Sequence, residues 1–219
     1  MPKITIDPVT RIEGHLAVEV VVDDGIVKET QCSGTLFRGF EIFLRGREPR
    51  DAPQITQRVC GVCPIVHATA SVLALDSAFG VSDSIPDNGR ITRNLILSSN
   101  YLQSHILHFY HLTALDYIDV TAMADYAGDD PQMKSMKDFL GRGELAPFVP
   151  RYEGDYRFDR ETNQQLVRHY LTALEMRKLA HEMLAIFGGK MPHNCAIVPG
   201  GVTENPTVDK IAGFLWRLN

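Results

Sequence analysis

The sequence predicts an α+β protein in which a small antiparallel N-terminal sheet leads into a mainly helical bundle body. Three observations support this class. Apolar residues alternate near the N-terminus, helical spacing takes over beyond Gly34, and the glycine patterns of nucleotide-binding folds do not occur. We therefore expect a β-rich part at residues 1–35 and a mainly helical part at 36–219.

The segment LAVEVVVDDGIVKET predicts a β-hairpin. Its apolar residues recur at every second position: Leu16, Val18, Val20 and Val22. The chain then turns at Asp24–Gly25, and extended residues resume after it. Such a turn needs positive φ, which glycine adopts without steric cost, so Asp-Gly between extended runs is a specific hairpin signal.

The body is expected to contain several helices. One covers residues 64–79, which are rich in Ala, Leu and Val without internal Gly or Pro, and it should be buried. A second, long helix runs from about Gly89 into the 110s. Its apolar residues recur at helix-compatible spacings: Ile91, Leu95, Leu102, Ile106 and Phe109. Its length suggests the core of a bundle.

Residues 125–160 are dense in Gly, Pro and Asp, which predicts an excursion with room for one short helix. Another helix is expected at 163–187, carrying Leu166, Tyr170, Leu174 and Met183. It should end at Gly188–Gly189, where a left-handed cap is sterically free. The tail from Val208 is expected to be helical again.

Composition excludes several partners. The net charge is −5 and no long basic run occurs, so neither nucleic acid nor an anionic membrane surface is expected. No stretch reaches the roughly 20 apolar residues that span a bilayer, so direct membrane insertion is not expected. The N-terminus MPKITIDPVTR has no apolar signal core. The sequence leaves the cellular compartment undetermined, because an exported protein of this kind would rely on the targeting signal of a partner subunit.

The segment RVCGVCPIVH carries the strongest chemical signal. Cys60 and Cys63 form a CxxC, and His67 follows four residues later, on the same face as Cys63 if a helix begins near Pro64. We expect Gly61 to let the backbone fold tightly, so that both thiolates reach one metal. Sulfur ligands favour nickel, iron, zinc or copper. Spacing alone leaves open a thioredoxin-like pair, half of a zinc site, or two buried thiols.

Two of these alternatives are disfavoured. The alternating β/α pattern of a thioredoxin is missing, and a zinc site would need a second ligand pair that this chain lacks. The four cysteines are all interpreted as thiols, and the isolated Cys32 and Cys195 as buried structural ones. His105, His108 and His111 recur every three residues, but no carboxylate accompanies them at ligand spacing. We therefore expect them to bond backbone or partner groups.

The segment RVCGVCPIVHATAS resembles the N-terminal signature RxCGxCxxxH of nickel-iron hydrogenase large subunits. Further segments similar to that family follow its order: DPVTRIEGHL at 7–16, FRGFEIFLRGREPRDA at 37–52, SHILHFYHL at 104–112, and GGKMPH with VPGGVT at 188–203. The similarity covers nearly the whole chain. It implies that residues 1–219 are the N-terminal portion of a hydrogenase large-subunit domain.

The resemblance assigns roles to five residues. Cys60 corresponds to a terminal nickel ligand, and Cys63 to a thiolate that bridges nickel to an iron carrying carbon monoxide and cyanide. His67 matches a residue that tunes the bridging sulfur. Glu13 matches the first proton carrier, and Glu41 the ligand of a buried magnesium. Without the resemblance, His67 would be a core histidine, and both glutamates ordinary solvated carboxylates.

The implied activity is the reversible oxidation of dihydrogen to protons and electrons, which pass to an iron-sulfur small subunit. In that family a C-terminal DPCxxC-like motif supplies the second cysteine pair, which is absent here. We expect a separate C-terminal half to provide it, the alternative being that this chain is a cleaved or truncated product. The alternatives are a quinone-reductase relative, which generally lacks these cysteines, and a non-catalytic CxxC module that binds zinc or an iron-sulfur cluster with a partner.

Overall fold

The computed structural model describes residues 2–143, 148 and 154–219. The chain divides into two compact units, Met1–Phe40 and Glu41–Asn219. The first unit is a small antiparallel sheet and the second is mainly helical, which confirms the predicted α+β class.

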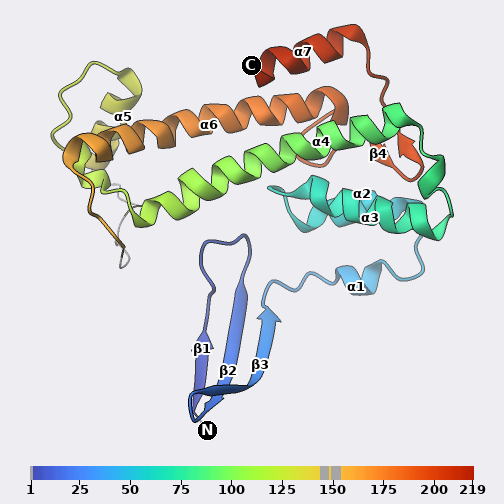
Figure 1. The fold of residues 1–219 in the computed structure, drawn as a ribbon, viewed down its shortest axis with the longest axis horizontal. Helices are drawn as coiled ribbons and strands as arrows, with labels where there is room; N and C mark the ends of the chain where they lie inside the picture. Colours follow the sequence, from blue (N-terminus) through green and yellow to red (C-terminus); the bar gives the residue numbers. More distant parts are fainter. Residues whose placement is uncertain (1, 144–147, 149–153) are drawn as a thin grey trace. The chain divides into compact units, whose positions relative to one another are not determined.

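The N-terminal unit is a three-stranded sheet with the order β1-β2-β3 (Figure 1). Its strands are β1 (Lys3–Ile6), β2 (Leu16–Asp23) and β3 (Ile26–Gly34). The turn between β2 and β3 has φ of 50° at Asp24 and 73° at Gly25, which confirms the predicted hairpin. Ala17 is the one buried residue among 2–40. The unit therefore has no apolar core of its own.

The second unit contains helices and one short hairpin (Figure 1). The helices are α1 (Phe40–Phe43), α2 (Ala52–Thr56), α3 (Pro64–Ala78), α4 (Asp87–Ile106), α5 (Pro131–Gly141), α6 (Arg160–Gly188) and α7 (Val208–Leu218). The shorter helical turns include η2 (Gln57–Val59), η4 (Leu107–Thr113, a π-helix) and η6 (Val120–Met123). The hairpin consists of β4 (Ile197–Val198) and β5 (Gly201–Val202). Helices α4 and α6 lie side by side, and α7 packs on α6.

The predicted helices are confirmed in position. α3, α6 and α7 match the expected ranges, and α4 continues through η4 into the 110s. Gly189 ends α6 as predicted, with a positive φ of 82° that glycine adopts freely, but its ψ of −35° differs from that of the expected left-handed cap. The short helix expected within 125–160 is α5, while residues 144–147 and 149–153 of that excursion lie outside the described residues.

Two apolar clusters hold the helical unit together, and α6 contributes to both. The α3 cluster comprises Ile65, Val72, Ile96, Met183, Leu184, Phe187, Ala196, Ile197 and Phe214. The α5 cluster comprises Ile118, Val120, Met123, Tyr126, Met133, Met136 and Val167. One long helix thus joins a core at α3 to a core at α5.

The buried face of α4 is not the one that its apolar spacing marks. Ile91 is 47% exposed and Phe109, in η4, is 59% exposed. The buried residues are mostly polar: Gly89, Thr92, Arg93, Ile96, Ser99, Asn100 and Gln103. Among them Arg93, Asn100 and Gln103 donate to backbone carbonyls of the β4–β5 hairpin and the loop before α3, which apolar side chains could not do. α3 is likewise buried on one side only, since Val66 and Leu73 are exposed.

Cys32 and Cys195 are exposed, so the expectation that they are buried thiols is wrong. Cys32 lies in β3, where every residue is exposed because the sheet has no second layer within its unit. Cys195 precedes β4 on a segment that buries its neighbours Asn194 and Ala196 instead. All four cysteines lie in the described part of the chain, and none of them forms a disulfide.

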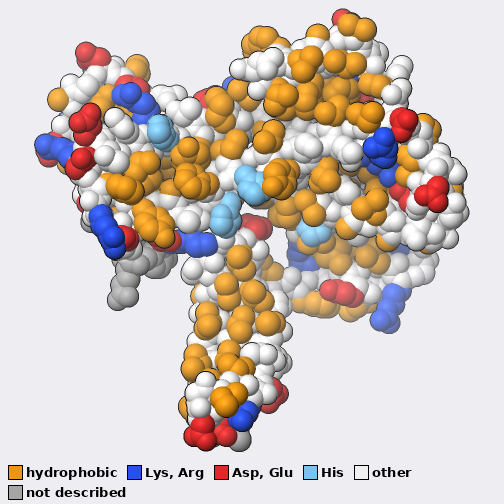
Figure 2. Space-filling model, in the orientation of Figure 1, with side chains coloured by type: hydrophobic (Ala, Val, Ile, Leu, Met, Phe, Trp, Pro, Cys, Tyr) orange, Lys and Arg blue, Asp and Glu red, His pale blue; other side chains and the backbone are white. Residues whose placement is uncertain are grey.

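Apolar side chains remain on the surface of the chain (Figure 2). On α7 the exposed ones include Val208 at 81% and Trp216 at 71% of their surface. In the described ranges, no helix has both the length and the apolar character that crossing a membrane requires.

Candidate metal centre

The CxxC forms a short loop between η2 and α3. Cys60 directly follows η2 with an extended backbone, and its side chain is buried. Cys63 is the N-cap of α3, and Pro64 occupies the first helical position, where its missing N–H costs no hydrogen bond. The local sequence therefore sets both the start of the helix and the position of the second sulfur.

The loop folds back over the first sulfur. The Sγ atom of Cys60 accepts the backbone N–H of Val62 at 3.2 Å and that of Cys63 at 3.4 Å. Two amide donors suit a sulfur with negative charge, the form in which cysteine binds metal. No contact among the described residues requires glycine at position 61, and its expected role at the metal stays a prediction. Its φ is not positive, and a Cβ there would meet nothing within 4 Å.

His67 lies beside the second sulfur. Its Nε2 atom is 3.6 Å from the Sγ atom of Cys63, one helical turn earlier, which confirms that the two share a face. The carbonyl of His67 accepts the hydroxyl of Thr56 at 3.4 Å, which links α3 to α2. With a proton on Nε2, the ring would donate to this sulfur and withdraw charge from it.

Polar side chains that sequence reasoning missed hold the segments around the loop. Gln57 and Asn194 pair reciprocally: the Gln57 amide donates to the Asn194 carbonyl at 3.2 Å, and the Asn194 amide donates to Gln57 Oε1 at 2.9 Å. Both side chains are fully buried. Asn194 directly follows the GGKMPH segment and is therefore not part of the motif that resembles the family.

A buried ion pair fastens the β4–β5 hairpin to α3 and α4. Arg93 Nη1 lies 2.6 Å from Asp76 Oδ2, and Arg93 also donates to the carbonyls of Val198 and Gly201 at 2.6 and 2.9 Å. Asp76 accepts the backbone N–H of Gly200 at 2.7 Å. Burial acts to raise the pKa of Asp76, but the bonds from Arg93 and Gly200 outweigh it and leave the pKa below its ordinary value.

The remaining predicted site residues are two glutamates, one in each unit. Glu13 is exposed in the bends between β1 and β2, one residue before Gly14, whose φ is 89°. Glu41 is exposed in the first turn of α1. The structure therefore brings Cys60, Cys63 and His67 together, and the roles of the two glutamates stay predictions.

The three histidines of the segment SHILHFYHL each contact a neighbouring group. The ring of His105 lies 4.1 Å from that of Tyr101, His108 Nδ1 bonds the hydroxyl of Thr113, and His111 Nε2 bonds the carbonyl of Tyr170 at 3.2 Å. Burial lowers the pKa of His111, which favours the neutral ring. These contacts agree with the expectation that the trio bonds backbone and neighbouring groups.

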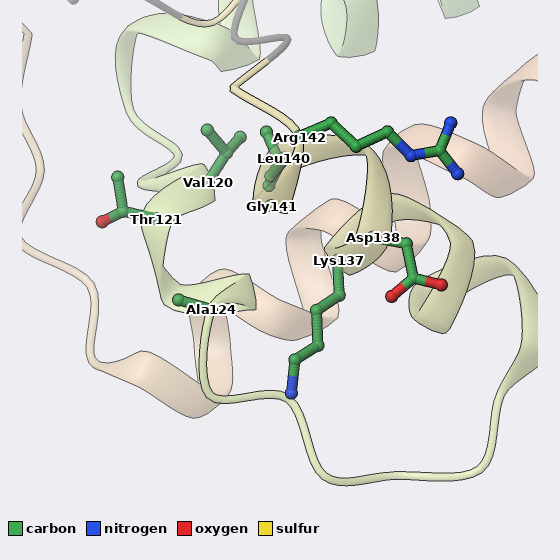
Figure 3. A pocket seen from close by; sticks show the side chains of 8 residues that line it. All are labelled: Val120, Thr121, Ala124, Lys137, Asp138, Leu140, Gly141 and Arg142. Atoms are coloured by element: carbon green, nitrogen blue, oxygen red, sulfur yellow. The ribbon is translucent and has the colours of Figure 1, made fainter.

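A hollow of about 690 Å³ opens between η6 and α5 (Figure 3). Its lining runs from Val120 to Ala124 on one side and from Lys137 to Arg142 on the other. None of the predicted site residues lines it. Lys137 donates to the carbonyl of Tyr126 at 2.8 Å. No Cys or Met stands among the described lining residues, so they offer the hollow no sulfur ligand.

The donor set fits part of a metal site. Over residues 2–143, 148 and 154–219, no three His, Cys, Asp or Glu side chains are grouped to hold a metal ion. Cys60 and Cys63 nevertheless lie on one short loop without a disulfide, with amide donors and a histidine beside the sulfurs. A soft metal could take these two sulfurs if further ligands came from outside the described residues.

The class of protein follows from comparison with known families. A family model described as nickel-dependent hydrogenase matches residues 38–215, and a second, described as HoxL-like, matches residues 3–33. The first match covers most of the chain and includes the cysteine loop. The chain belongs to the nickel-dependent hydrogenase family.

Individual relatives of this chain are also named as hydrogenases. The periplasmic NiFeSe hydrogenase large subunit of Desulfomicrobium baculatum is 53% identical over 225 residues, covering 99% of this chain and 39% of the relative. The quinone-reactive Ni/Fe-hydrogenase large chain of Wolinella succinogenes is 39% identical, covering 92% of this chain and 39% of its own. The solved Ni-Fe-Se hydrogenase from D. vulgaris Hildenborough matches with a TM-score of 0.75 and 53% identity over 99% of this chain and 40% of its own. The chain thus spans about 40% of these relatives, their N-terminal part.

Proposed function

We propose that this chain is the N-terminal portion of a hydrogenase large subunit that interconverts dihydrogen with protons and electrons. The observation that carries the proposal is the CGVC loop, which brings Cys60, Cys63 and His67 together in a member of the nickel-dependent hydrogenase family. Relatives along nearly the whole chain are named as large subunits of hydrogenases.

In this proposal Cys60 would hold nickel, and Cys63 would hold both the nickel and an iron that would carry carbon monoxide and cyanide. The bound centre would supply the splitting of dihydrogen and accept its electrons. The chain's own part is to present two sulfurs from one rigid loop and to place the His67 ring beside one of them. The remaining ligands would come from the C-terminal part of the large subunit.

Further groups complete the proposal. Glu13 would carry the proton away, Glu41 would bind magnesium, and electrons would pass to iron-sulfur clusters in a small subunit. The exposed apolar face of α7, with Val208 and Trp216, supports a cover by another part of the assembly. The chain's span of about 40% of its relatives makes the rest of the large subunit the natural candidate.

The test of the site is Cys63→Ser in the assembled enzyme. A hydroxyl does not supply the charged sulfur at neutral pH, so we expect loss of nickel and iron together with hydrogen uptake. Elemental analysis should include zinc and selenium, because one relative is named a NiFeSe hydrogenase. The control is Cys195→Ser, which changes an exposed thiol and should leave the metals in place.

Several outcomes would decide against the proposal. Full nickel and iron content with undiminished hydrogen uptake in Cys63→Ser would contradict the proposed bridging role of Cys63. Zinc alone in the unaltered protein would favour a structural CxxC module. An assembly without any metal would favour the quinone-reductase relative.

The proton role of Glu13 is tested separately from metal binding. Glutamine keeps the shape but cannot ionise, so Glu13→Gln should retain nickel and iron while suppressing hydrogen uptake and hydrogen-deuterium exchange. Glu29→Gln, an exposed change in β3 of the same unit, serves as the control. Isotope exchange at the normal rate in Glu13→Gln would assign the proton to another group.

A further inference from the structure

We propose that Gln103 is a positioning residue for the metal-binding loop, because its buried amide holds the Val62 carbonyl between the two cysteines. The proposal deepens the proposed function and rests on it for the identity of the metal. The loop conformation itself stands on the contacts of this chain alone.

Hydrogen bonds on both sides hold the peptide group that joins Val62 to Cys63. The carbonyl of Val62 accepts Gln103 Nε2 at 2.8 Å and Asn100 Nδ2 at 3.2 Å. The same peptide plane carries the N–H of Cys63, which points to the sulfur of Cys60 at 3.4 Å. Since carbonyl and N–H lie on opposite sides of a rigid trans peptide, holding one orients the other. The amides of α4 thereby help to direct an N–H at a metal-binding sulfur.

The orientation of the Gln103 amide is itself determined by α6. Its Oε1 atom accepts Arg177 Nε and Nη2, each at 3.4 Å, and His181 Nε2 at 3.3 Å. Arg177 can only donate, so oxygen must occupy this side of the amide. The nitrogen then faces Val62 and the hydroxyl of Ser104 at 2.9 Å. Burial and the charge of Arg177 lower the pKa of His181, which favours the neutral ring. Because Gln103 Oε1 is an acceptor, the proton of this ring belongs on Nε2.

The result is a continuous path from α6 through α4 to the loop. Gln103 is fully buried, so water does not replace its bonds. If its donor is removed, the Val62 carbonyl keeps only the longer bond from Asn100. The peptide plane is then freer to rotate, and the N–H at the Cys60 sulfur rotates with it.

The test is Gln103→Glu in the assembled enzyme. Glutamate has the same shape and still accepts from Arg177 and His181, but at neutral pH it cannot donate to Val62. The matched control is Gln164→Glu. The Gln164 amide also donates to a backbone carbonyl, that of Ala122, at 2.8 Å, and it lies on α6 near the α5 cluster.

Two measurements are made on each variant. Amide hydrogen exchange of the peptide containing Val62 and Cys63, measured on metal-free protein, should be about tenfold faster in Gln103→Glu than in the unaltered protein and the control. Release of nickel to a chelator should be about 10- to 100-fold faster, with shifted g-values of the nickel paramagnetic signal. Gln164→Glu should leave the exchange at this peptide and the nickel signal unchanged.

The outcomes separate this proposal from the proposed function. Unchanged exchange at the loop in Gln103→Glu would overturn the positioning role, whatever the metal content. Faster exchange in a protein that never contains nickel would support positioning and reject the proposed metal. If Gln103→Glu does not assemble, Asn100→Asp removes the longer donor to the same carbonyl and should produce the same changes at smaller size, while no change there would overturn the proposal.

Discussion

The two ends of α6 are packed in different ways. At the α3 cluster, apolar residues are accompanied by buried polar side chains: Gln57, Asp76, Arg93, Asn100, Gln103 and Asn194. At the α5 cluster, methionine and aliphatic side chains join α5, η6 and α6, with Asn163 buried nearby. The first end contains the cysteine loop and the β4–β5 hairpin, whereas the second is mainly an assembly of helices.

This difference follows from what each end has to hold. Loops leave backbone carbonyls and N–H groups without partners, and buried ones must be paired by side chains. The carbonyls of Val62, Val198 and Gly201 all find their donors on α4. Where regular helices meet, the backbone is already satisfied, so apolar packing is sufficient. A rigid site therefore needs polar groups in its core.

Breaking the buried ion pair between Arg93 and Asp76 should have the largest effect on the stability of the end of α6 near α3. Arg93→Met leaves Asp76 buried without its cation and removes donors from the hairpin carbonyls, so we expect a loss of about 3–5 kcal/mol in unfolding free energy. Chemical denaturation of the assembled enzyme measures it. Arg90→Met, whose pair with Asp87 on the same helix is exposed, should change little. Equal losses in the two variants would contradict the structural importance of the buried pair.

A cavity in the other cluster should cost stability without affecting the site. Met133 is 1% exposed, and Met133→Ala should lower the unfolding free energy by about 2–3 kcal/mol, because neighbouring methionines can partly fill the space. Nickel per folded molecule should stay normal. Met176→Ala, at an exposed position on α6, is the control. Nickel loss from folded Met133→Ala protein would show that the two ends are coupled.

The pH dependence of the ion pair is the smallest expected effect. The pKa of Asp76 is lower in the folded protein than its ordinary 3.8, so its contribution is present above that value and is lost as pH falls through the folded pKa. We therefore expect the stability advantage over Asp76→Asn to be largest near neutral pH and to shrink in acid. Unfolding of both proteins across the acid range measures this. A pH-independent difference would mean that charge on Asp76 contributes nothing.

Much of the local structure was determined by the sequence alone. Asp24–Gly25 predicted the hairpin, Gly189 the end of α6, and the spacing of Cys63 and His67 their contact across one turn. These features depend on residues close together in the chain, and backbone geometry converts such spacing directly into position. The assignment of all 219 residues to one portion of a larger domain stays a prediction.

The tertiary structure alone decided which polar residues hold the site. Gln57 pairs with Asn194 across 137 residues, and Gln103 reaches Val62 across 41. Apolar periodicity located α4 but marked the wrong face, because a buried glutamine or arginine is indistinguishable in sequence from a solvated one. Its partner is a backbone carbonyl. Every residue has one, so the residue type does not indicate which carbonyl will be the partner. Only the folded chain brings that carbonyl and its donor together.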